Sequence, residues 1–427
     1  MFDNFKKDRP LESVRQTARR LISALGEANA QSIALKLIEQ YEKLDAGQRT
    51  AFFEYLASEF NPDAEQVRAI AEAYYKEPNA ANLIELCRIA EPRRQELLRR
   101  INRAPTGTAS IIRMRQELLP LLKNNPGLAA IDADMHHLLS SWFNPGFLEL
   151  HQITWDSPAQ LLEKIIQHEA VHTIDGWDDL RRRLQPDRRC YAFFHPQLPN
   201  EPLIFVEVAL VPGIAGDVGV LLDKHATVGS AKHFKAAIFY SISNCQPGLR
   251  GVSLGNFLIK RVAQKLAEEV PGLKLYSTLS PIPGFTHWLE RGAELPEGAV
   301  TGARMRRLEE ARQTVGLDEK GWSGRIKEGW RPDRCTPAEK TALMRLCAMY
   351  LMYCTPARSG DSVAKFHLSN GATLHQINWG ADLSKKGMQQ SAGMMVNYLY
   401  ELDKVEQQHE AFSRQVVIYS RGVEKLI

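Results

Sequence analysis

The chain changes character once, near residue 142, and this change limits the folds open to it. Before that point apolar residues recur at helical spacing, as at Leu11, Val14, Ala18 and Leu21, and Pro-containing breaks separate one helical stretch from the next. Beyond it, runs rich in β-forming residues alternate with helical ones. We therefore expect an α+β multidomain protein, with an all-helical domain over 1–141 followed by an α/β domain over 142–427.

Composition supports a folded protein and argues against a polyanionic partner. The 427 residues are enough for two or three domains, and 44% of them are hydrophobic. Lys and Arg number 54 against 50 Asp and Glu, so the surplus of +4 is too small and too mixed for the electrostatic field that a general nucleic-acid binder needs. We expect no nucleic-acid partner.

Cysteines and terminal residues favour a cytoplasmic protein. The six cysteines lack the paired short spacings of a zinc ribbon or a disulfide framework, so free thiols in a reducing compartment are expected. Acidic residues at Asp3, Asp8 and Glu12 argue against a secretory or transit segment. The longest purely apolar run, Ala348–Cys354, is far shorter than the ~20 residues that span a bilayer. No membrane association is expected.

The α/β part is expected to contain a series of strands and helices. A long polar stretch at 292–333 reads as an insertion with one helix, and Lys365–Trp379 reads as a hairpin turned at Asn370-Gly371. The other expected strands are 147–155, 190–195, 203–211, 236–243 and 275–279, and the other expected helices are 157–172, 177–184, 252–269 and 336–354.

The motif His168-Glu169-Ala170-Val171-His172 matches the HExxH pattern of zinc hydrolases. On one helix, the two histidines would share a face and bind zinc while the glutamate acted as a base. No convincing third ligand follows, and the motif ends an ordinary amphipathic helix. We therefore expect no metal site, with the histidines being solvated or packed between domains.

A glycine-rich loop lies between an apolar strand and a helix, at Gln246–Gly255. Glycines let the backbone approach a phosphate, and the amides at a helix start supply donors. The pattern is neither a P-loop nor a dinucleotide fingerprint. It is similar to the acyl-CoA pyrophosphate loop of the GNAT acyltransferase fold, although a glycine-rich turn without a ligand fits the segment alone equally well.

Two further motifs each allow a structural and a functional interpretation. In Ser280-Pro281-Ile282-Pro283-Gly284, two prolines stiffen a turn at the carboxyl end of a strand, where ligands of open α/β sheets bind. Ser280 either caps the next helix or faces a ligand. His367 is expected on an apolar strand beside the Asn370-Gly371 turn, where it is either a core residue or a partner of the serine.

Taken together, these motifs resemble the malonyl-CoA decarboxylase family across nearly the whole chain. The resemblance implies a helical oligomerisation domain followed by a GNAT-like catalytic domain, and a homo-oligomer, dimer or tetramer, with malonyl-CoA as substrate. One departure is that some members have an acidic residue where this chain has Ser253. The segments that carry the resemblance are Trp142–Phe147, Arg189–Pro196, Pro199–Leu203, Phe239–Ser243, Ser280–Phe285 and Phe366–Ala372.

The resemblance also assigns site residues. It makes Ser280 and His367 the catalytic pair. Asn370, Tyr398 and His287 are candidate supporting groups only because they lie in or near these motifs. The residues matched to the family's CoA loop are Arg250, Gly251, Val252, Ser253, Leu254, Gly255 and Asn256.

The reaction of this family suits such a pair. Decarboxylation of a malonyl thioester needs no cofactor, because the thioester carbonyl accepts the electrons as an enolate. Each preorganised donor at the developing oxyanion is worth about 3–4 kcal/mol. We expect His367 to act as general acid and Ser280 to position the substrate. The alternatives are a GNAT-type acyltransferase, a non-catalytic malonyl-CoA sensor and, more remotely, a zinc hydrolase.

Overall fold

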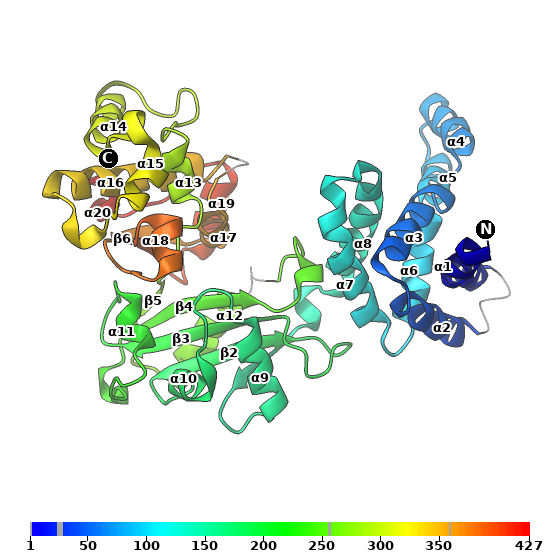
Figure 1. Ribbon diagram of the computed structural model, residues 1–427, viewed down its shortest axis with the longest axis horizontal. Coiled ribbons are helices and arrows are strands. Elements are labelled where there is room, and N and C mark those ends of the chain that lie inside the picture. The colour runs from blue at the N-terminus through cyan, green and yellow to red at the C-terminus, as the bar shows by residue number, and fades with distance from the viewer. Residues whose placement is uncertain (1, 24–28, 255–257, 358–359) are drawn as a thin grey trace. The chain divides into compact units, whose positions relative to one another are not determined.

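Figure 1 shows a computed structural model of the chain, which describes residues 2–23, 29–254, 258–357 and 360–427. Contacts between residues divide it into two compact units. The first contains Met1–Glu149, Phe194–Leu203 and Cys245–Leu254, and the second contains Leu150–Phe193, Ile204–Asn244 and Gly255–Ile427. The helical unit thus includes two short segments from the later part of the sequence.

The first unit is built from helices, and three of those described begin at side-chain caps. Asp45 and Gln48 form a capping box at the start of α3, and Asp63 and Asn79 cap α4 and α5. The expected apolar face of α1 is buried. The helices are α1 (Phe2–Leu21), α2 (Ala30–Glu42), α3 (Ala46–Glu59), α4 (Ala64–Lys76), α5 (Ala80–Ala90), α6 (Arg93–Asn102), α7 (Gly107–Leu118) and α8 (Ala129–Trp142), with short 3₁₀ turns at Leu119–Lys123, Pro126–Leu128 and Pro145–Phe147.

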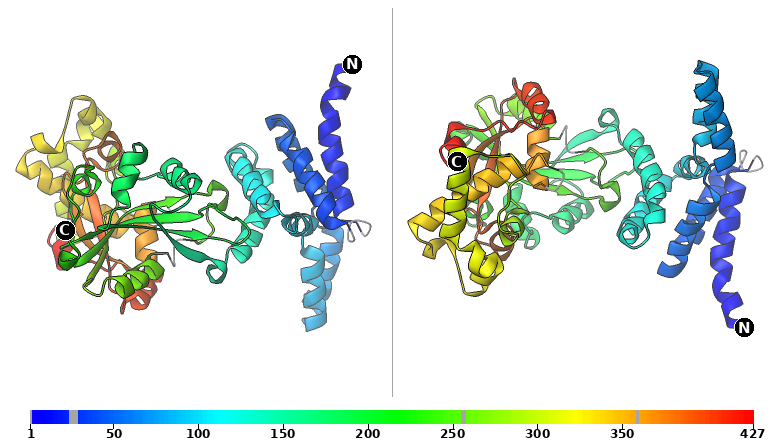
Figure 2. Two further views of the ribbon diagram at one scale, coloured as in Figure 1. Left: turned by 90° about the horizontal axis from the view of Figure 1, so that it is seen from below. Right: turned by 90° about the horizontal axis from the view of Figure 1, so that it is seen from above.

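Helices α4 and α5 form a hairpin that is exposed along its whole length. Figure 2 shows the two helices side by side. Every residue of 64–90 is described, and none of their side chains is buried within this chain. Tyr75 is 88% exposed and Ile84 is 68% exposed, so large apolar side chains of this hairpin face away from the chain's own core.

The second unit is organised around a seven-stranded sheet in the order β1-β2-β3-β4-β5-β7-β6. The pairs β2–β3, β3–β4, β5–β7 and β6–β7 are antiparallel, whereas β4 and β5 are parallel. The parallel pairing runs from Ala236 opposite Leu275 to Phe239 opposite Thr278, although β4 continues to Asn244. The strands are β1 (Glu149–Ile153), β2 (Arg188–Phe194), β3 (Ile204–Val211), β4 (Ala236–Asn244), β5 (Leu275–Thr278), β6 (Thr373–Asn378) and β7 (Met395–Tyr400).

Helices and short 3₁₀ turns surround the sheet in the second unit. Apolar side chains of β3, β4 and α11 share one core cluster, which includes Ala209, Val218 and Ile238. The helices are α9 (Ala159–His168), α10 (Gly176–Arg183), α11 (Val218–Leu222), α12 (Leu258–Glu269), α13 (Phe285–Glu290), α14 (Gly302–Val315), α15 (Leu317–Lys327), α16 (Pro337–Met349), α17 (Ser362–Ser369), α18 (Lys385–Ser391), α19 (Val405–Ser413) and α20 (Arg421–Glu424), and a π-helical turn, Tyr350–Cys354, continues α16.

The expected fold class is confirmed: helices come first, and an α/β part with a mixed sheet follows. The strands expected from β1 to β5 are all present. The single helix expected in 292–333 is wrong, because two helices, α14 and α15, occupy it. Gly316 separates them with φ of 66°, a left-handed conformation that ends a helix. Among the described residues, no helix is long and apolar enough to cross a bilayer.

Candidate active site

Ser280 is fixed at the end of β5, just beyond the parallel pairing with β4. Its N–H donates to the Val396 carbonyl at 2.8 Å, and the N–H of Val396 donates back to Ser280 at 2.9 Å. This isolated antiparallel bridge fixes Ser280 to β7, outside the regular pairing of β5 with β7. Pro281 and Pro283 then restrict the following turn. The backbone of Ser280 is therefore fixed by β7 and by the stiff turn that follows, which places its hydroxyl.

His367 lies on a helix, so the expectation that it lies on a strand of a hairpin is wrong. The helix is α17, and Asp361 caps it by accepting from the amides of Val363 and Ala364 at 3.0 Å. Asn370 and Gly371, expected as the hairpin turn, instead end this helix, and Gly371 has φ of 75°. The same residue pair serves both purposes, because a left-handed glycine suits a hairpin turn and a helix C-terminus equally.

The structure brings Ser280 and His367 together, although they are 87 positions apart. The Ser280 Oγ is 3.0 Å from Nε2 of His367, and it donates to Oγ1 of Thr278 at 2.9 Å. Thr278 also accepts from the N–H of Tyr398 at 3.1 Å. Ser280 and His367 are only 5% and 3% exposed, so the contact is largely withdrawn from water.

Two tyrosines of β7 complete the surroundings of the imidazole. The ring of Tyr398 stacks on His367 with centroids 4.7 Å apart, and Nδ1 of His367 is 2.9 Å from the hydroxyl of Tyr400. The Tyr398 hydroxyl is buried and has no hydrogen-bond partner among the described residues. Sequence reasoning named Tyr398 but missed Tyr400 and Thr278. Strand alternation was the signal for both, since each lies two residues from a named one.

Burial decides the charge of these groups. It lowers the pKa of His367 to about 3, so the imidazole is neutral at neutral pH. Burial also raises the pKa of the Tyr400 phenol well above its usual value, which keeps it protonated. The partner of Nδ1 is thus a neutral phenol, whereas the serine-hydrolase triad has a carboxylate there. The arrangement favours hydrogen-bond donation over activation of Ser280 as a nucleophile.

The side chains of Asn370 and His287, the other expected supporting residues, make other contacts. Asn370 ends α17 and donates from Nδ2 to the Phe366 carbonyl at 2.6 Å. His287 lines a cavity of about 490 Å³ together with Trp288, Arg291 and Asp361, and neither Ser280 nor His367 is among its lining residues. The structure therefore places Tyr398 against the pair, but not His287.

The described part of the glycine-rich loop packs on helices of its own unit. Arg250, Gly251, Val252, Ser253 and Leu254 are described, and Gly251 has φ of 86°. Gly255 and Asn256 lie outside the described residues. The helix that follows is α12, whose described part begins at Leu258; Val252 to Leu254, where the helix was expected to begin, are not helical.

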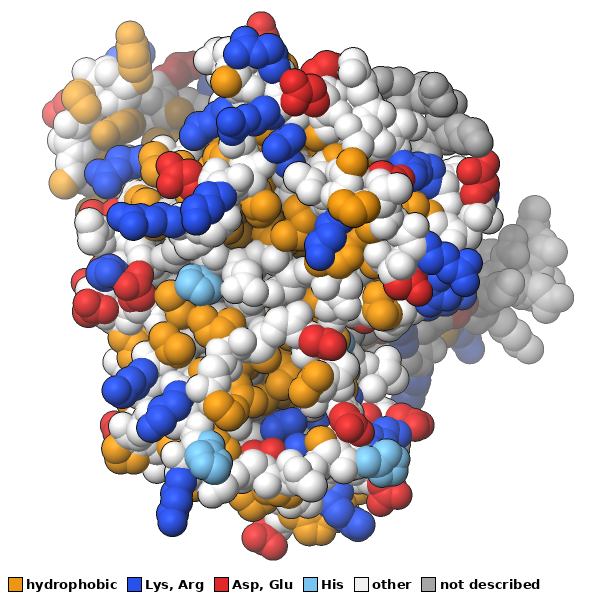
Figure 3. Space-filling model, turned by 90° about the vertical axis from the view of Figure 1, so that its left-hand side faces the viewer, with side chains coloured by type: hydrophobic (Ala, Val, Ile, Leu, Met, Phe, Trp, Pro, Cys, Tyr) orange, Lys and Arg blue, Asp and Glu red, His pale blue; other side chains and the backbone are white. Residues whose placement is uncertain are grey.

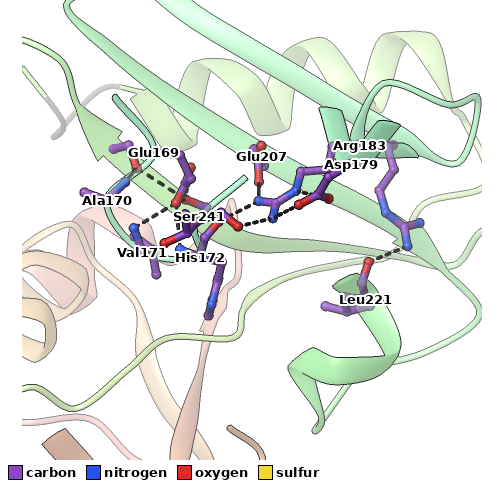
Figure 4. A network of polar contacts seen from close by, with 12 residues as sticks. Glu169, Ala170, Val171, His172, Asp179, Arg183, Glu207, Leu221 and Ser241 are labelled. Atoms are coloured by element: carbon purple, nitrogen blue, oxygen red, sulfur yellow. Dashed lines mark hydrogen bonds and ion pairs between the residues drawn. The ribbon is translucent and has the colours of Figure 1, made fainter. Parts of the chain in front are cut away.

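The helix expected over 157–172 is too long, so His168 and His172 do not lie on one helix. Helix α9 ends at His168, and Glu169 has extended backbone angles, so the two histidines do not share a helical face. Figure 4 shows that Glu169 turns inward instead, where it accepts from the amides of Val171 and His172 and from the Ser241 hydroxyl. In the part of the chain that the structure describes, no group of three or more His, Cys, Asp or Glu side chains is arranged to hold a metal ion.

One face of the molecule shows the mixture of charges that the balanced count predicts (Figure 3). On the face shown in Figure 3, Lys and Arg side chains are separated by acidic, hydrophobic and uncharged ones. Such a mixed surface does not create the one-signed field that polyanion binding uses.

Comparison with known proteins gives one consistent result. The sequence matches the malonyl-CoA decarboxylase N-terminal domain over residues 60–143 and the malonyl-CoA decarboxylase C-terminal domain over residues 146–427. A Mus musculus protein named malonyl-CoA decarboxylase, mitochondrial, is 37% identical over 383 residues, which are 84% of this chain and 77% of that protein. A similar protein of Anser anser anser is 35% identical over 90% of this chain and 80% of its own length.

Solved structures agree over almost the full length. The crystal structure of malonyl-CoA decarboxylase from Rhodopseudomonas palustris is 42% identical, with a TM-score of 0.83, and the match covers 97% of this chain and 99% of that one. The enzyme from Agrobacterium vitis has the same identity and coverage, with a TM-score of 0.84. The chain therefore belongs to the malonyl-CoA decarboxylase family.

Proposed function

We propose that this chain is an enzyme that converts malonyl-CoA to acetyl-CoA and carbon dioxide. Family membership supports the reaction, and the buried contact between Ser280 and His367 is the observation that carries the mechanism. A buried neutral pair, with a phenol in place of the third carboxylate of a triad, suits donation of a proton to the developing enolate.

The substrate supplies its own electron sink. The bond between C2 and the carboxylate carbon breaks, carbon dioxide leaves, and the electron pair enters the thioester as an enolate. One proton added at C2 then gives acetyl-CoA. No oxidant or reductant is needed, so we infer a cofactor-free reaction in which the protein contributes donors to the enolate oxygen and a proton to C2.

The neutral imidazole determines how the pair works. When the Tyr400 hydroxyl donates to Nδ1, Nε2 carries the hydrogen and donates to Ser280 Oγ. The serine hydrogen, which points to Thr278 in the free protein, is then available to the substrate. We expected His367 to be the general acid, but a neutral imidazole is a poor one, so we assign this role to Ser280 instead. A neutral hydroxyl is a stronger acid than the methyl group of a thioester, so Ser280 can protonate C2. His367 Nε2–H then supports the serine oxygen, and one proton from water restores the pair.

The glycine-rich loop is the proposed site for the CoA phosphates. The loop's own carbonyls accept from the amides of Arg250, Val252 and Leu254. The amides of Gly251 and Ser253 have no partner among the described residues. Unpaired backbone amides in a glycine-containing turn are suitable donors to a phosphate. Ser253 supplies no carboxylate, so no step of the proposed mechanism uses one from this loop.

One incubation tests the proposed activity. Malonyl-CoA alone should be consumed, and mass spectrometry should find acetyl-CoA and carbon dioxide in equal amounts. A GNAT-type acyltransferase would need an added amine and would release free CoA. A malonyl-CoA sensor would bind the compound and return it unchanged, and either of these results would contradict the proposal.

We also predict that activity needs no metal ion. The electron sink is the substrate, and the only HExxH sequence does not form a helical ligand pair. Treatment with a chelator followed by gel filtration should leave the turnover number unchanged. Complete loss of activity that stoichiometric zinc restores would contradict this prediction.

A homo-oligomer joined through the helical unit is part of the same proposal. The exposed hairpin of α4 and α5, with Tyr75 and Ile84 on its surface, supports it. The dimer and the tetramer remain alternatives that sedimentation velocity distinguishes. The cytoplasmic location also stays a prediction, since the two vertebrate relatives are named as mitochondrial.

A further inference from the structure

We propose that Arg115, on α7 of the helical unit, is a positioning residue that holds the glycine-rich loop in the shape that binds the CoA phosphates. The inference rests on the proposed function, because it gives the loop its ligand. It adds a role for the helical unit in substrate binding, beyond the oligomerisation expected from the family resemblance.

Arg115 is almost completely buried and connects two helices with the loop. Its Nη1 donates to the carbonyls of Gly248 and Arg250, both at 2.8 Å. Its Nε donates to Oδ1 of Asp132 on α8, also at 2.8 Å. The residue is 2% exposed. One guanidinium therefore fixes two loop carbonyls and is itself oriented by a carboxylate, which a planar fork of donors does well.

The loop also approaches α7 more closely than any side chain at Gly248 would allow. A Cβ added at Gly248 would lie 2.0 Å from the carbonyl oxygen of Ile112, which is backbone and cannot rotate away. Gly248 is buried in a short 3₁₀ turn, Pro247–Leu249, directly before Arg250. The close approach of Gly248 and the hydrogen bonds to Gly248 and Arg250 thus hold this segment against α7 in two independent ways.

This attachment has a consequence for the amides that follow. Arg115 fixes the carbonyl of Arg250, which belongs to the same peptide unit as the N–H of Gly251. That amide has no partner among the described residues. Because a peptide unit is planar, fixing its carbonyl also fixes the direction of its N–H. Arg115 therefore orients a candidate phosphate donor without touching the phosphate.

The test compares two substrates in the full-length protein. Malonyl-CoA carries the phosphates, whereas malonyl-pantetheine carries the same thioester without them. With Arg115→Lys, which keeps the charge beside Asp132 but loses the fork, KM for malonyl-CoA should rise by ~10-fold or more with kcat nearly unchanged. KM for malonyl-pantetheine should not change, so the preference for the larger substrate should shrink.

A second variant reaches the same loop by steric means. Gly248→Ala leaves Arg115 intact but forces the loop away from α7, and it should cause the same selective loss. Arg113→Lys is the matched control, because Arg113 lies on the same helix but is exposed and pairs with Glu42. The control should leave both KM values unchanged. Asp132 is the more exposed partner of Arg115, so Asp132→Asn should raise KM for malonyl-CoA by a smaller factor. This variant still tests the proposal if Arg115→Lys and Gly248→Ala do not fold.

The outcomes separate this inference from the proposed function. Equal changes in KM for both substrates, or an unchanged KM for malonyl-CoA in the folded variants, would overturn the role of Arg115. Calorimetric binding of CoA to the wild type and to Arg115→Lys tests the same point without turnover. A wild-type protein that binds CoA but releases no carbon dioxide would contradict the proposed reaction alone.

Discussion

Replacing either Ser280 or His367 with Ala lowers the turnover number by roughly 100-fold or more, with little change in KM, if the two act as one unit on the reacting thioester. The reason is that each side chain completes the other. Without His367, Ser280 loses the donor to its oxygen, and without Ser280, Nε2 has no hydroxyl to support. Steady-state kinetics on malonyl-CoA measures both effects.

The double variant decides whether the pair is a unit. We expect Ser280→Ala with His367→Ala to be scarcely worse than the poorer single variant, because the second change removes a group that has already lost its partner. Losses that multiply would mean independent roles. Ser369→Ala is the control, since this serine ends the same helix and its hydroxyl donates to the Phe366 carbonyl of its own turn. The Ser369→Ala variant should keep wild-type activity. A His367→Ala variant that remains active would show that His367 has only a structural role.

A second result separates this mechanism from that of a serine hydrolase. No acyl-enzyme is expected, because the phenol of Tyr400 occupies the place where a triad has a carboxylate. Intact-protein mass spectrometry during turnover should therefore show the unmodified chain. A mass increase on Ser280 would show that the hydroxyl acts as a nucleophile.

The sequence predicted the contact between Ser280 and His367 better than it predicted the secondary structure around it. Ser280 was placed correctly at the end of a strand because prolines and apolar alternation are local signals. The element that carries His367 was wrong because Asn370-Gly371 ends helices and turns hairpins alike, and the choice depends on packing. A Cβ at Gly371 would lie 2.1 Å from the Val405 carbonyl, a contact that no local pattern reveals.

Partners that depend on the fold were beyond local reasoning. Tyr400 reaches His367 only because β7 pairs with β5, which places the two tyrosines of one strand face beside α17. Arg115 reaches the glycine-rich loop across more than 130 positions. Nothing in the spacing of α7 distinguishes this arginine from Arg113, because both lie in an ordinary helical pattern. Burial distinguishes them, and burial is a property of the folded chain.

The largest expected effect on stability comes from Arg183, in the buried network of Figure 4. Its Nη1 donates to Glu207 and to the His172 carbonyl, both at 2.9 Å, and its Nε donates to Asp179 at 3.0 Å. The Arg183 side chain is only 3% exposed. Removing one partner of a buried ion pair leaves the other charge without compensation, at a cost of ~3–5 kcal/mol.

Arg183→Met should therefore lower the free energy of unfolding by about that amount, measured by urea denaturation followed by circular dichroism. The control is Arg181→Met, two residues earlier on α10. Arg181 pairs with Asp178 at 3.5 Å in a largely exposed position, so its loss should cost less than ~1 kcal/mol. Similar losses in the two variants would show that the buried network contributes no more than a surface pair.

The same variant should show a characteristic dependence on pH. Burial raises the pKa of Glu207 to about 8, while the Arg183 guanidinium opposes that rise. A raised carboxyl pKa contributes stability at low pH that is lost as pH rises toward the folded-state value. In the wild type this loss stops above about pH 8, because Glu207 then ionises beside Arg183. In Arg183→Met the pKa of Glu207 rises further, so this protein continues to lose stability above pH 8. The difference in the free energy of unfolding between the two proteins should therefore widen from pH 7 to pH 9. A constant difference over that range would show that Glu207 has the same ionisation state in both proteins, so that Arg183 does not lower its pKa.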